Sequence, residues 1–267
     1  MEDSSQSQHW NKFAQQWNKL SSPMRPCAED VEIMRRNLGS DPGRTLLLGV
    51  TPELAEHSKN LIALDNNAAM IEALWSDDKE GHHAVLGDWL DMPFEPQYFD
   101  TVIGDGSTVL LSYPTQYEQL FEQISRVIKP GGRVSIRFFL RPENGETCAI
   151  VCNEALSGRI KGFHAFKWRL SMAVAAEGGQ PDINVADTFA AFDRLLPDRK
   201  QLAEATGWSM EEITTIDLYR GSEARYSYPA LSELRQKIPP AFVEESIECG
   251  TYELAECCST MTFLYLP

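Results

Sequence analysis

Basic residues are scarce in this sequence. Its 267 residues include 24 Lys plus Arg against 39 Asp plus Glu, which gives a formal net charge of −15 at pH 7. Such an acidic surface repels phosphate backbones and anionic lipid headgroups. We therefore expect neither a nucleic acid nor a membrane as a partner.

Paired cysteines and long apolar runs are also absent. None of the six cysteines forms a Cys-x-x-Cys pair, and His82-His83 has no cysteine at zinc-ligand spacing, so we expect no metal site. The first residues lack the basic start and apolar core of a signal peptide, and no run approaches the roughly 18 apolar residues of a membrane span. Scattered cysteines in an acidic chain are typical of reduced thiols. These features predict a cytoplasmic protein.

What the sequence does have is a series of short apolar runs separated by helical patterns. Strands are expected at 45–50, 61–65, 85–89, 99–104 and 133–140, and helices at 28–38, from Pro52 onward, at 68–75 and at 115–128. Strands that alternate with helices at this spacing form a parallel sheet with crossover helices. We predict an α/β fold with a doubly wound, seven-stranded, mostly parallel sheet.

The remaining segments are expected to add to this sheet within a single domain, residues 1–267. Trp10, Phe13 and Trp17 share one helical face, which indicates an N-terminal helical lid over residues 1–40. Residues 145–206 show mostly helical patterns and are expected to form an insertion that caps the carboxyl ends of the strands. Two late strands, at 212–219 and 259–266, would complete the sheet.

A strand, a glycine and a helix, followed by a strand that ends on an acid, form the first chemical signal. Gly49 ends the first expected strand and Asp65 ends the second. A glycine lets the backbone approach a ligand, and a carboxylate at the next strand end can accept hydrogen bonds from ribose hydroxyls. Taken alone, this pattern fits any nucleoside-binding α/β fold.

Five blocks of sequence then resemble the class I S-adenosylmethionine-dependent methyltransferases, in particular the group related to ubiquinone-biosynthesis methyltransferases. The blocks are LLLGV at 46–50, LIALDNNAAMI at 61–71, GDWLDMPF at 87–94, FDTVIGDGS at 99–107 and ISRVIKPGGRVSIRFF at 124–139. They occur in the family order and cover about a third of the chain. The resemblance implies the Rossmann-like methyltransferase fold, S-adenosylmethionine as cofactor, and methyl transfer as the activity.

The resemblance also implies roles for individual residues. Gly49 would lie beneath the methionine part of the cofactor, Asp65 would bind the ribose hydroxyls with Asn66 beside it, and Met70 would pack near the adenine. An ordinary position in a helix core is the alternative for Met70.

The next two strand ends complete the implied cofactor site. Asp88 would accept a hydrogen bond from the adenine amino group, and Trp89 would offer its backbone N–H to the ring, unless it is a core aromatic. Asp105, with Gly106 beside it, would lie close to the methionine amino group or the substrate.

The first motif departs from the family pattern of an acid followed by G-x-G-x-G. Leu47 replaces the acid, while Thr51 and Glu53 replace the second and third glycines, so the glycine motif is degenerate. Thr51 is expected to cap the following helix and to donate its hydroxyl to the cofactor carboxylate. Glu53 would compete electrostatically with that carboxylate.

Methyl transfer needs mainly an in-line geometry, but an oxygen or nitrogen nucleophile can also need a base. No catalytic residue is evident; the weak candidates are His164 in the insertion, Tyr113 after the fourth strand, and Arg137, which with Arg141 could hold an anionic substrate. Structural roles are open for each of these residues.

We predict transfer of a methyl group from S-adenosylmethionine to a small molecule. One alternative is a non-catalytic cofactor-binding or protein-interaction module that keeps the methyltransferase fold. Another is a nicotinamide-dependent oxidoreductase, because the same pattern serves dinucleotides, although the G-x-G-x-x-G spacing is absent.

Overall fold

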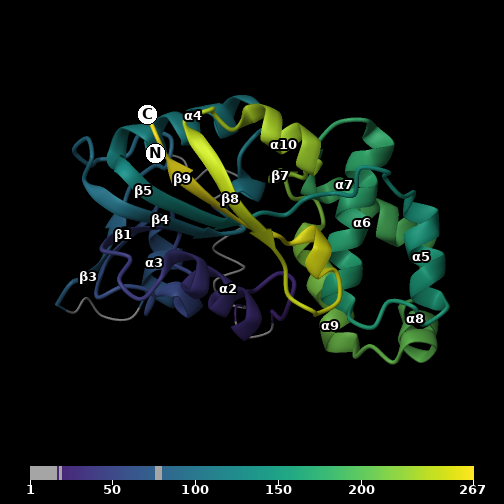
Figure 1. The fold of residues 1–267 in the computed structure, drawn as a ribbon. Helices are drawn as coiled ribbons and strands as arrows, with labels where there is room; N and C mark the ends of the chain where they lie inside the picture. The colour runs from purple at the N-terminus through teal and green to yellow at the C-terminus, as the bar shows by residue number, and fades with distance from the viewer. Residues whose placement is uncertain (1–16, 18–19, 76–79) are drawn as a thin grey trace.

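A seven-stranded sheet forms the centre of the computed structural model, which describes residues 17, 20–75 and 80–267 (Figure 1). The spatial order of the strands is β3-β2-β1-β4-β5-β9-β8. The five strands from β3 to β5 are parallel, and β9 is antiparallel to both β5 and β8. The bounds are β1 Arg44–Leu48, β2 Asn60–Asp65, β3 His82–Leu86, β4 Phe99–Asp105, β5 Ile128–Arg137, β8 Phe242–Glu248 and β9 Thr260–Tyr265. This is the predicted α/β fold with a mostly parallel sheet.

Alternating side chains of the buried strands enter two cores on opposite faces of the sheet. Leu46 and Leu48 of β1 pack with α4 (Thr115–Val127) and α10 (Leu231–Lys237), whereas Leu47 packs on the face of α2 (Ala28–Leu38) and α3 (Ala68–Leu74). Because successive side chains of a strand point to opposite faces, an unbroken apolar run of this kind requires helices on both sides. Figure 1 shows these helices above and below the sheet.

A helical cap, which we define as residues 148–227, lies between β5 and β8 in the chain and at one end of the sheet (Figure 1). It contains α5 Cys148–Leu156, α6 Phe163–Gly178, β6 Asp182–Asn184, α7 Val185–Leu195, α8 Arg199–Thr206, α9 Met210–Thr214, the 3-10 helix η4 Thr215–Tyr219 and β7 Arg225–Ser227. Its interior is continuous with the core beneath α2 and α3. The cap therefore shares the core on the α2 and α3 face of the sheet.

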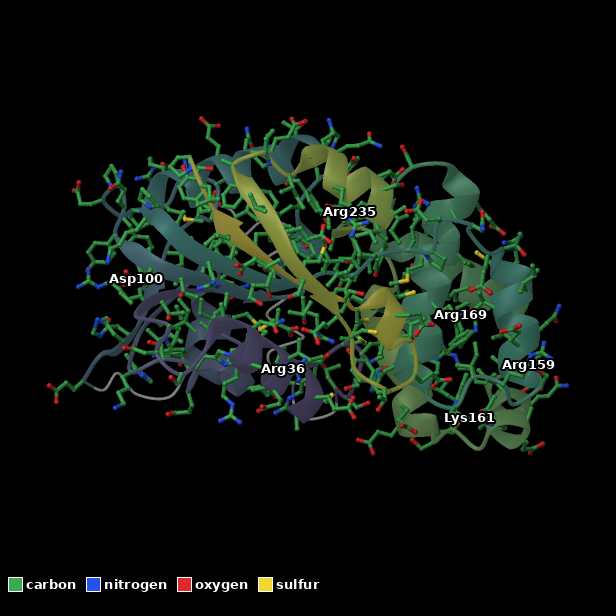
Figure 2. All side chains as sticks on the ribbon, viewed as in Figure 1. Arg36, Asp100, Arg159, Lys161, Arg169 and Arg235 are labelled. Atoms are coloured by element: carbon green, nitrogen blue, oxygen red, sulfur yellow. The ribbon has the colours of Figure 1, made fainter. Side chains whose placement is uncertain are left out.

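Aromatic packing and ion pairs stabilise the cap. The rings of Phe163 and Phe166 lie 5.4 and 5.3 Å from the ring of Trp208, whose indole nitrogen donates to the backbone carbonyl of Lys161. Arg169 of α6, labelled in Figure 2, donates to Glu146 and pairs with Glu154 at 2.8 Å. These contacts fix α6 as a rigid wall of the cap.

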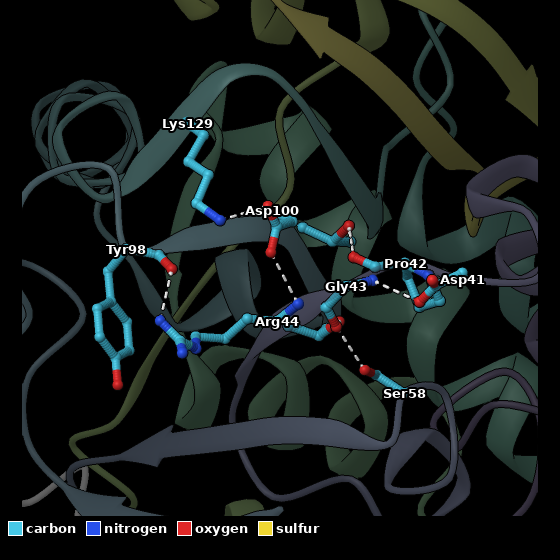
Figure 3. Close-up of polar contacts among 10 residues, drawn as sticks. Asp41, Pro42, Gly43, Arg44, Ser58, Tyr98, Asp100 and Lys129 are labelled. Carbon is cyan, nitrogen blue, oxygen red and sulfur yellow. Dashed lines mark hydrogen bonds and ion pairs between the residues drawn. The ribbon is translucent and has the colours of Figure 1, made fainter.

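A polar cluster fixes the amino ends of β1 and β4 (Figure 3). Asp100 accepts hydrogen bonds from the backbone N–H of Arg44 at 2.9 Å and from the ammonium group of Lys129 at 2.6 Å. The hydroxyl of Ser58 donates to the carbonyl of Gly43 at 2.6 Å. The cluster therefore holds the strands in register at the edge opposite their carboxyl ends.

Two expected elements are corrected by the structure. The strand expected at 212–219 is wrong: these residues form the end of α9 and η4, and the sheet instead gains β8, which pairs with β9. The helix expected from Pro52 onward is a single 3-10 turn, η2 Pro52–Leu54. Two further 3-10 helices are η3 Ser107–Leu110 and η5 Ala255–Cys257.

Several expected bounds shift by a few residues. β3 begins three residues earlier than the expected strand at 85–89, and β5 extends back to Ile128 through the Pro-Gly-Gly segment. The helices expected at 28–38, 68–75 and 115–128 are present as α2, α3 and α4. The aromatic helix expected around Trp10 and Phe13 lies outside the described residues. Within the described part of the chain, no helix combines the length and the apolar character needed to span a bilayer.

Candidate active site

The carboxyl ends of β1, β2 and β4 open into a cavity of about 510 Å³. Ligand sites in open α/β sheets lie at this edge, and ligand pockets are typically about 300–1,000 Å³ in volume. Its walls come from four parts of the chain: the strand ends, α3, the segment before α2, and the cap. The predicted cofactor residues that line it are Gly49, Thr51, Asp65, Asn66, Met70, Asp88, Trp89, Asp105 and Gly106.

Gly49 begins the turn that forms the cavity floor. Its φ of 100° lies in a region that favours glycine, and its N–H donates to the carbonyl of Leu64 at 2.8 Å. The same carbonyl accepts from the indole nitrogen of Trp89 at 2.6 Å. A Cβ on Gly49 would lie 3.8 Å from the Trp89 ring and 3.9 Å from Oδ2 of Asp65. The bare backbone of Gly49 therefore keeps the floor open between these two side chains.

Asp65 places a buried carboxylate on the cavity wall. Its Oδ1 accepts from the backbone N–H of Asn67 at 2.8 Å, which orients the group at the end of β2. Burial raises its pKa to about 6, and the Asn67 hydrogen bond opposes that rise only in part. A carboxylate with so little solvation gains from hydroxyl donors on a ligand.

Asp88 and Met70 border the same part of the cavity. Oδ1 of Asp88 accepts from the backbone N–H of Leu90 at 2.9 Å, so one carboxylate oxygen already closes the turn after β3. Met70 is buried in the first turn of α3, where Asn67 caps the helix by accepting from the Met70 N–H at 3.0 Å. This N-terminal capping bond from Asn67 holds the start of α3 beside the end of β2.

Asp105 belongs to a buried ion-pair network behind the cavity wall. Arg137, which is fully buried, donates from Nε to Asp105 and from Nη1 to the hydroxyl of Tyr252 at 2.9 Å. Asp30 of α2 lies 3.5 Å from the same Nη1 and accepts from Tyr252 at 2.8 Å. Burial raises the pKa of Asp105, and the Arg137 guanidinium opposes that effect. The network holds the Asp105 carboxylate in place.

The turn after β1 differs from the sequence prediction in a way that affects the site. Because η2 is a single 3-10 turn, Thr51 makes no side-chain capping bond, although it is buried and lines the cavity. Glu53 forms an ion pair with Arg25 and is not among the cavity-lining residues. Its charge is therefore compensated within the protein.

The β4, β5 and cap side of the cavity is mainly apolar. Val109, Leu110 and Leu111 follow β4, Phe139 follows β5, and Trp168 and Tyr226 come from the cap. The Phe139 ring lies over Gly106, where a Cβ would come within 2.3 Å of it. The absence of a side chain at Gly106 is therefore what lets Phe139 reach the cavity.

The weak catalytic candidates do not line this cavity. His164 is buried in α6 with its ring 6.3 Å from that of Phe163. Tyr113 donates its hydroxyl to the carbonyl of Glu233 at 3.0 Å, and Arg141 pairs with Glu233 at 2.8 Å. Arg137 contacts two lining residues: it pairs with Asp105, and its guanidinium carbon lies 5.1 Å from the centroid of the Phe139 ring. A direct role of any of them in the reaction stays a prediction.

Sequence reasoning assigned Trp17 to the N-terminal lid but did not single out several other lining residues. Leu20 and Met24 precede α2, and Ser107 and Phe139 each lie two residues beyond the end of a strand. For Ser107 and Phe139, the signal that could have found them is their place just beyond the carboxyl ends of β4 and β5, where ligands bind in open α/β sheets. Among the residues that the structure describes, no group of three or more His, Cys, Asp or Glu is placed to hold a metal ion.

Comparison with known proteins gives one family match. Residues 48–136, a third of the chain, match a family model described as a methyltransferase domain. These residues include β1 to β4, most of β5 and the strand ends around the cavity. No curated protein sequence matches the chain.

Solved structures share the fold at low sequence identity. A Rhodobacter sphaeroides protein, provisionally titled a zinc-dependent alcohol dehydrogenase, has a TM-score of 0.59 and 13% identity, with 100% of this chain and 99% of that chain covered. A chain of the Haloferax volcanii complex between the Trm112 methyltransferase activator and a methyltransferase has a TM-score of 0.55 and 10% identity, with both chains covered completely.

A third structure is an enzyme with its ligands. The Burkholderia thailandensis 1,6-didemethyltoxoflavin-N1-methyltransferase, with bound 1,6-didemethyltoxoflavin and S-adenosylhomocysteine, has a TM-score of 0.55 and 11% identity, with 98% of this chain and 88% of that chain covered. Likeness at these identities establishes the fold. The protein therefore has the Rossmann-like methyltransferase fold, its residues 48–136 match the methyltransferase-domain model, and these comparisons support S-adenosylmethionine as its cofactor.

Proposed function

We propose that this protein transfers a methyl group from S-adenosylmethionine to a small molecule held in the cavity at the carboxyl edge of the sheet. The observation that carries the proposal is that Asp65, Asp88 and Asp105 line one cavity of about 510 Å³ whose β4, β5 and cap side is mainly apolar. The motif order within residues 45–140 further supports a place near the ubiquinone-biosynthesis methyltransferases. The absence of paired cysteines supports a cytoplasmic location.

The residues present fit the cofactor. The poorly solvated Asp65 carboxylate is matched to ribose hydroxyls, and Asp88 lies at the neighbouring strand end, where an adenine amino group would donate. Because Asp65 and Asp88 make this part of the cavity acidic, they also favour a sulfonium and an ammonium group. Gly49 leaves room for the ligand where the backbone passes closest to it.

The division of the cavity follows the strand order. Asp88, Asp65 and Gly49 follow β3, β2 and β1, so the donor would extend along these strand ends, with Asn66 and Met70 beside it. Asp105 and Gly106 lie at the next strand, β4, where the donor and acceptor halves meet. The cofactor supplies an activated methyl group when bound. The chain contributes by binding, by orienting the acceptor and by excluding water.

Two segments would close the cavity. Trp17, Leu20 and Met24 line it from the proposed lid within residues 1–40, and Trp168 lines it from the proposed insertion at 145–206. Trp17 and Leu20 are both buried, so this segment already excludes solvent from one side.

The test is calorimetric titration with S-adenosylmethionine, S-adenosylhomocysteine and, as a control, NAD. We expect both adenosyl ligands to bind at micromolar concentrations and NAD not to bind. Asp65→Asn keeps the shape but removes the charge, and should weaken S-adenosylhomocysteine binding at least about 10-fold, as the loss of a charged hydrogen bond does. Asp193→Asn, at an exposed position of α7, removes the same charge away from the cavity and should change nothing.

The outcomes separate the candidate functions. Absence of adenosyl binding in a folded protein would contradict the proposal and favour the non-catalytic module. Binding of NAD with equal affinity would favour an oxidoreductase.

A further inference from the structure

The acceptor half of the cavity carries an aromatic wall made of three side chains that lie far apart in the sequence. The ring of Trp168 lies 4.8 Å from that of Phe139 at an interplanar angle of 79°, and 5.5 Å from that of Tyr226 at 58°. Edge-to-face and tilted arrangements at these distances are favourable between aromatic rings. All three side chains are buried and line the cavity, so their positions are set by packing before any ligand arrives.

Trp168 has a polar group that the protein does not satisfy. Its indole Nε1 is buried and has no hydrogen-bond partner among the described residues. Buried tryptophan N–H groups usually have a partner, as the Nε1 of Trp208 and that of Trp89 do here. The hydroxyl of Ser107, which lines the same half, also lacks a partner in the described part of the chain. Both atoms have almost no accessible area, so a ligand atom reaches Nε1 of Trp168 only after a small rotation of the indole toward the cavity. It then recovers the free energy that a buried donor without a partner costs.

The charges of this half are already compensated or solvated. Asp105 is paired with Arg137 behind the wall. Glu223 and Arg225 line the cavity from exposed positions, and Arg225 lies 3.8 Å from Asp182. Among the described residues that line this half, the buried charge, Asp105, already has its counter-charge in Arg137, so an acceptor of either sign would gain little there.

From this arrangement we propose that the methyl acceptor is an uncharged, planar aromatic molecule whose ring packs against Trp168 and Phe139 and which offers a hydrogen-bond acceptor to Nε1 of Trp168. The inference rests on the proposed function, because it assigns the second half of the same cavity. It names Trp168 as the residue that selects a substrate with a hydrogen-bond acceptor atom at this position.

The test uses quinoline, an uncharged bicyclic ring with one acceptor nitrogen, titrated in the presence of saturating S-adenosylhomocysteine and followed by saturation-transfer NMR. Quinoline-4-carboxylate adds a charge and cyclohexanol replaces the planar ring. We expect quinoline to bind more tightly than either. Trp168→Phe keeps a ring and removes the N–H, and should weaken quinoline binding about 3- to 10-fold, which corresponds to the loss of one neutral hydrogen bond.

Trp208→Phe is the matched control, because it removes an indole N–H of the cap that does not line the cavity. It should leave quinoline binding unchanged within about twofold. If Trp168→Phe fails to fold, Phe139→Leu takes its place, because it removes the aromatic neighbour of Trp168 and should weaken quinoline binding in the same way.

S-Adenosylhomocysteine binding, measured separately, distinguishes the two levels of failure. If it binds while quinoline binds no better than the carboxylate or cyclohexanol, or is insensitive to Trp168→Phe, the inference is overturned and the proposed function stands. If S-adenosylhomocysteine itself does not bind, the proposed function has failed.

Discussion

Glu53 forms an ion pair with Arg25, so the acidic residue in the turn after β1 is neutralised by the segment that precedes α2. Arg25 also lies over the ring of Trp17, with its guanidinium carbon 5.6 Å from the ring centroid. Trp17 lines the cavity. The acidic residue of the turn after β1 and the segment that covers the cavity are thus linked through one arginine.

Removal of Arg25 should weaken binding of the cofactor product. In Arg25→Ala, Glu53 loses its counter-charge two residues from Thr51, which lines the cavity, and Trp17 loses a packing partner. We expect the affinity for S-adenosylhomocysteine to fall roughly 3- to 10-fold, since the pair is only partly buried. Isothermal titration calorimetry measures the change.

Two further variants test the cause of that effect. Arg25→Ala with Glu53→Gln removes both charges and should restore most of the affinity. Arg36→Ala breaks the exposed ion pair between Arg36 of α2, labelled in Figure 2, and Glu248 of β8, and should leave binding unchanged. Equal losses in Arg36→Ala and Arg25→Ala would show that general electrostatics, and not the Glu53 pair, is responsible.

Cofactor affinity should depend on the ionisation of Asp65. Burial raises the pKa of Asp65 from 3.8 to about 6, and only the ionised carboxylate accepts two hydroxyl hydrogen bonds. Affinity for S-adenosylhomocysteine should therefore fall as the pH decreases through 6, by up to about 10-fold per pH unit below it. Binding near pH 6 should also release protons, which calorimetry in buffers of different ionisation enthalpy detects.

The effect of Asp65 on folding has the opposite sign. A carboxyl whose pKa is higher in the folded state stabilises the fold below pH 3.8, and that contribution is lost as the pH rises through about 6. Asp65→Asn should abolish both pH dependences. An unchanged pH profile of binding in Asp65→Asn would assign the titration to another group.

Much of the sheet follows from local sequence because its strands are buried on both faces. The runs Leu46–Leu48 and Leu61–Leu64 are apolar without interruption. Such a pattern is typical of a strand that is covered on both faces. The acids that line the cavity follow from the same reasoning, since Asp65 and Asp105 end such runs. Position at a strand end is therefore a local signal for the site.

The strand predicted at 212–219 is wrong, although its β-branched residues favour a strand. Ser209 and Glu212 form a capping box, in which Ser209 Oγ accepts from the Glu212 N–H at 3.1 Å and its own N–H donates to Glu212 at 3.0 Å. That signal is visible in the sequence and predicts a helix start. Ile213 and Ile216, three residues apart, then pack in the cap.

Other features depend on contacts that no local pattern carries. β8 reads Phe-Val-Glu-Glu-Ser-Ile-Glu and has mainly exposed or half-buried residues, so its identity as a strand comes from pairing with β9. The meeting of Phe139, Trp168 and Tyr226 likewise depends on how the cap packs on the sheet, and residue spacing along the chain does not encode it.

A buried lysine in the cap should make folding stability depend on pH. Lys167 of α6 is fully buried, donates to Thr215 Oγ1 at 3.3 Å and lies 5.1 Å from the centroid of the Tyr219 ring. Burial lowers its pKa from 10.5 to about 7, and a group with a lowered lysine pKa destabilises the fold wherever the unfolded chain is still protonated. Stability should therefore rise as the pH increases from 7 towards 10.5.

Lys167→Met keeps the length of the side chain and removes the amine. Its free energy of unfolding at pH 7, measured by urea titration, should exceed that of the unchanged protein by on the order of 2 kcal/mol, because one pKa unit corresponds to about 1.4 kcal/mol and relaxation recovers part of the shift. The difference should shrink at pH 9, where less work is needed to hold the amine neutral. A difference that is constant between pH 7 and pH 9 would attribute the gain to packing alone.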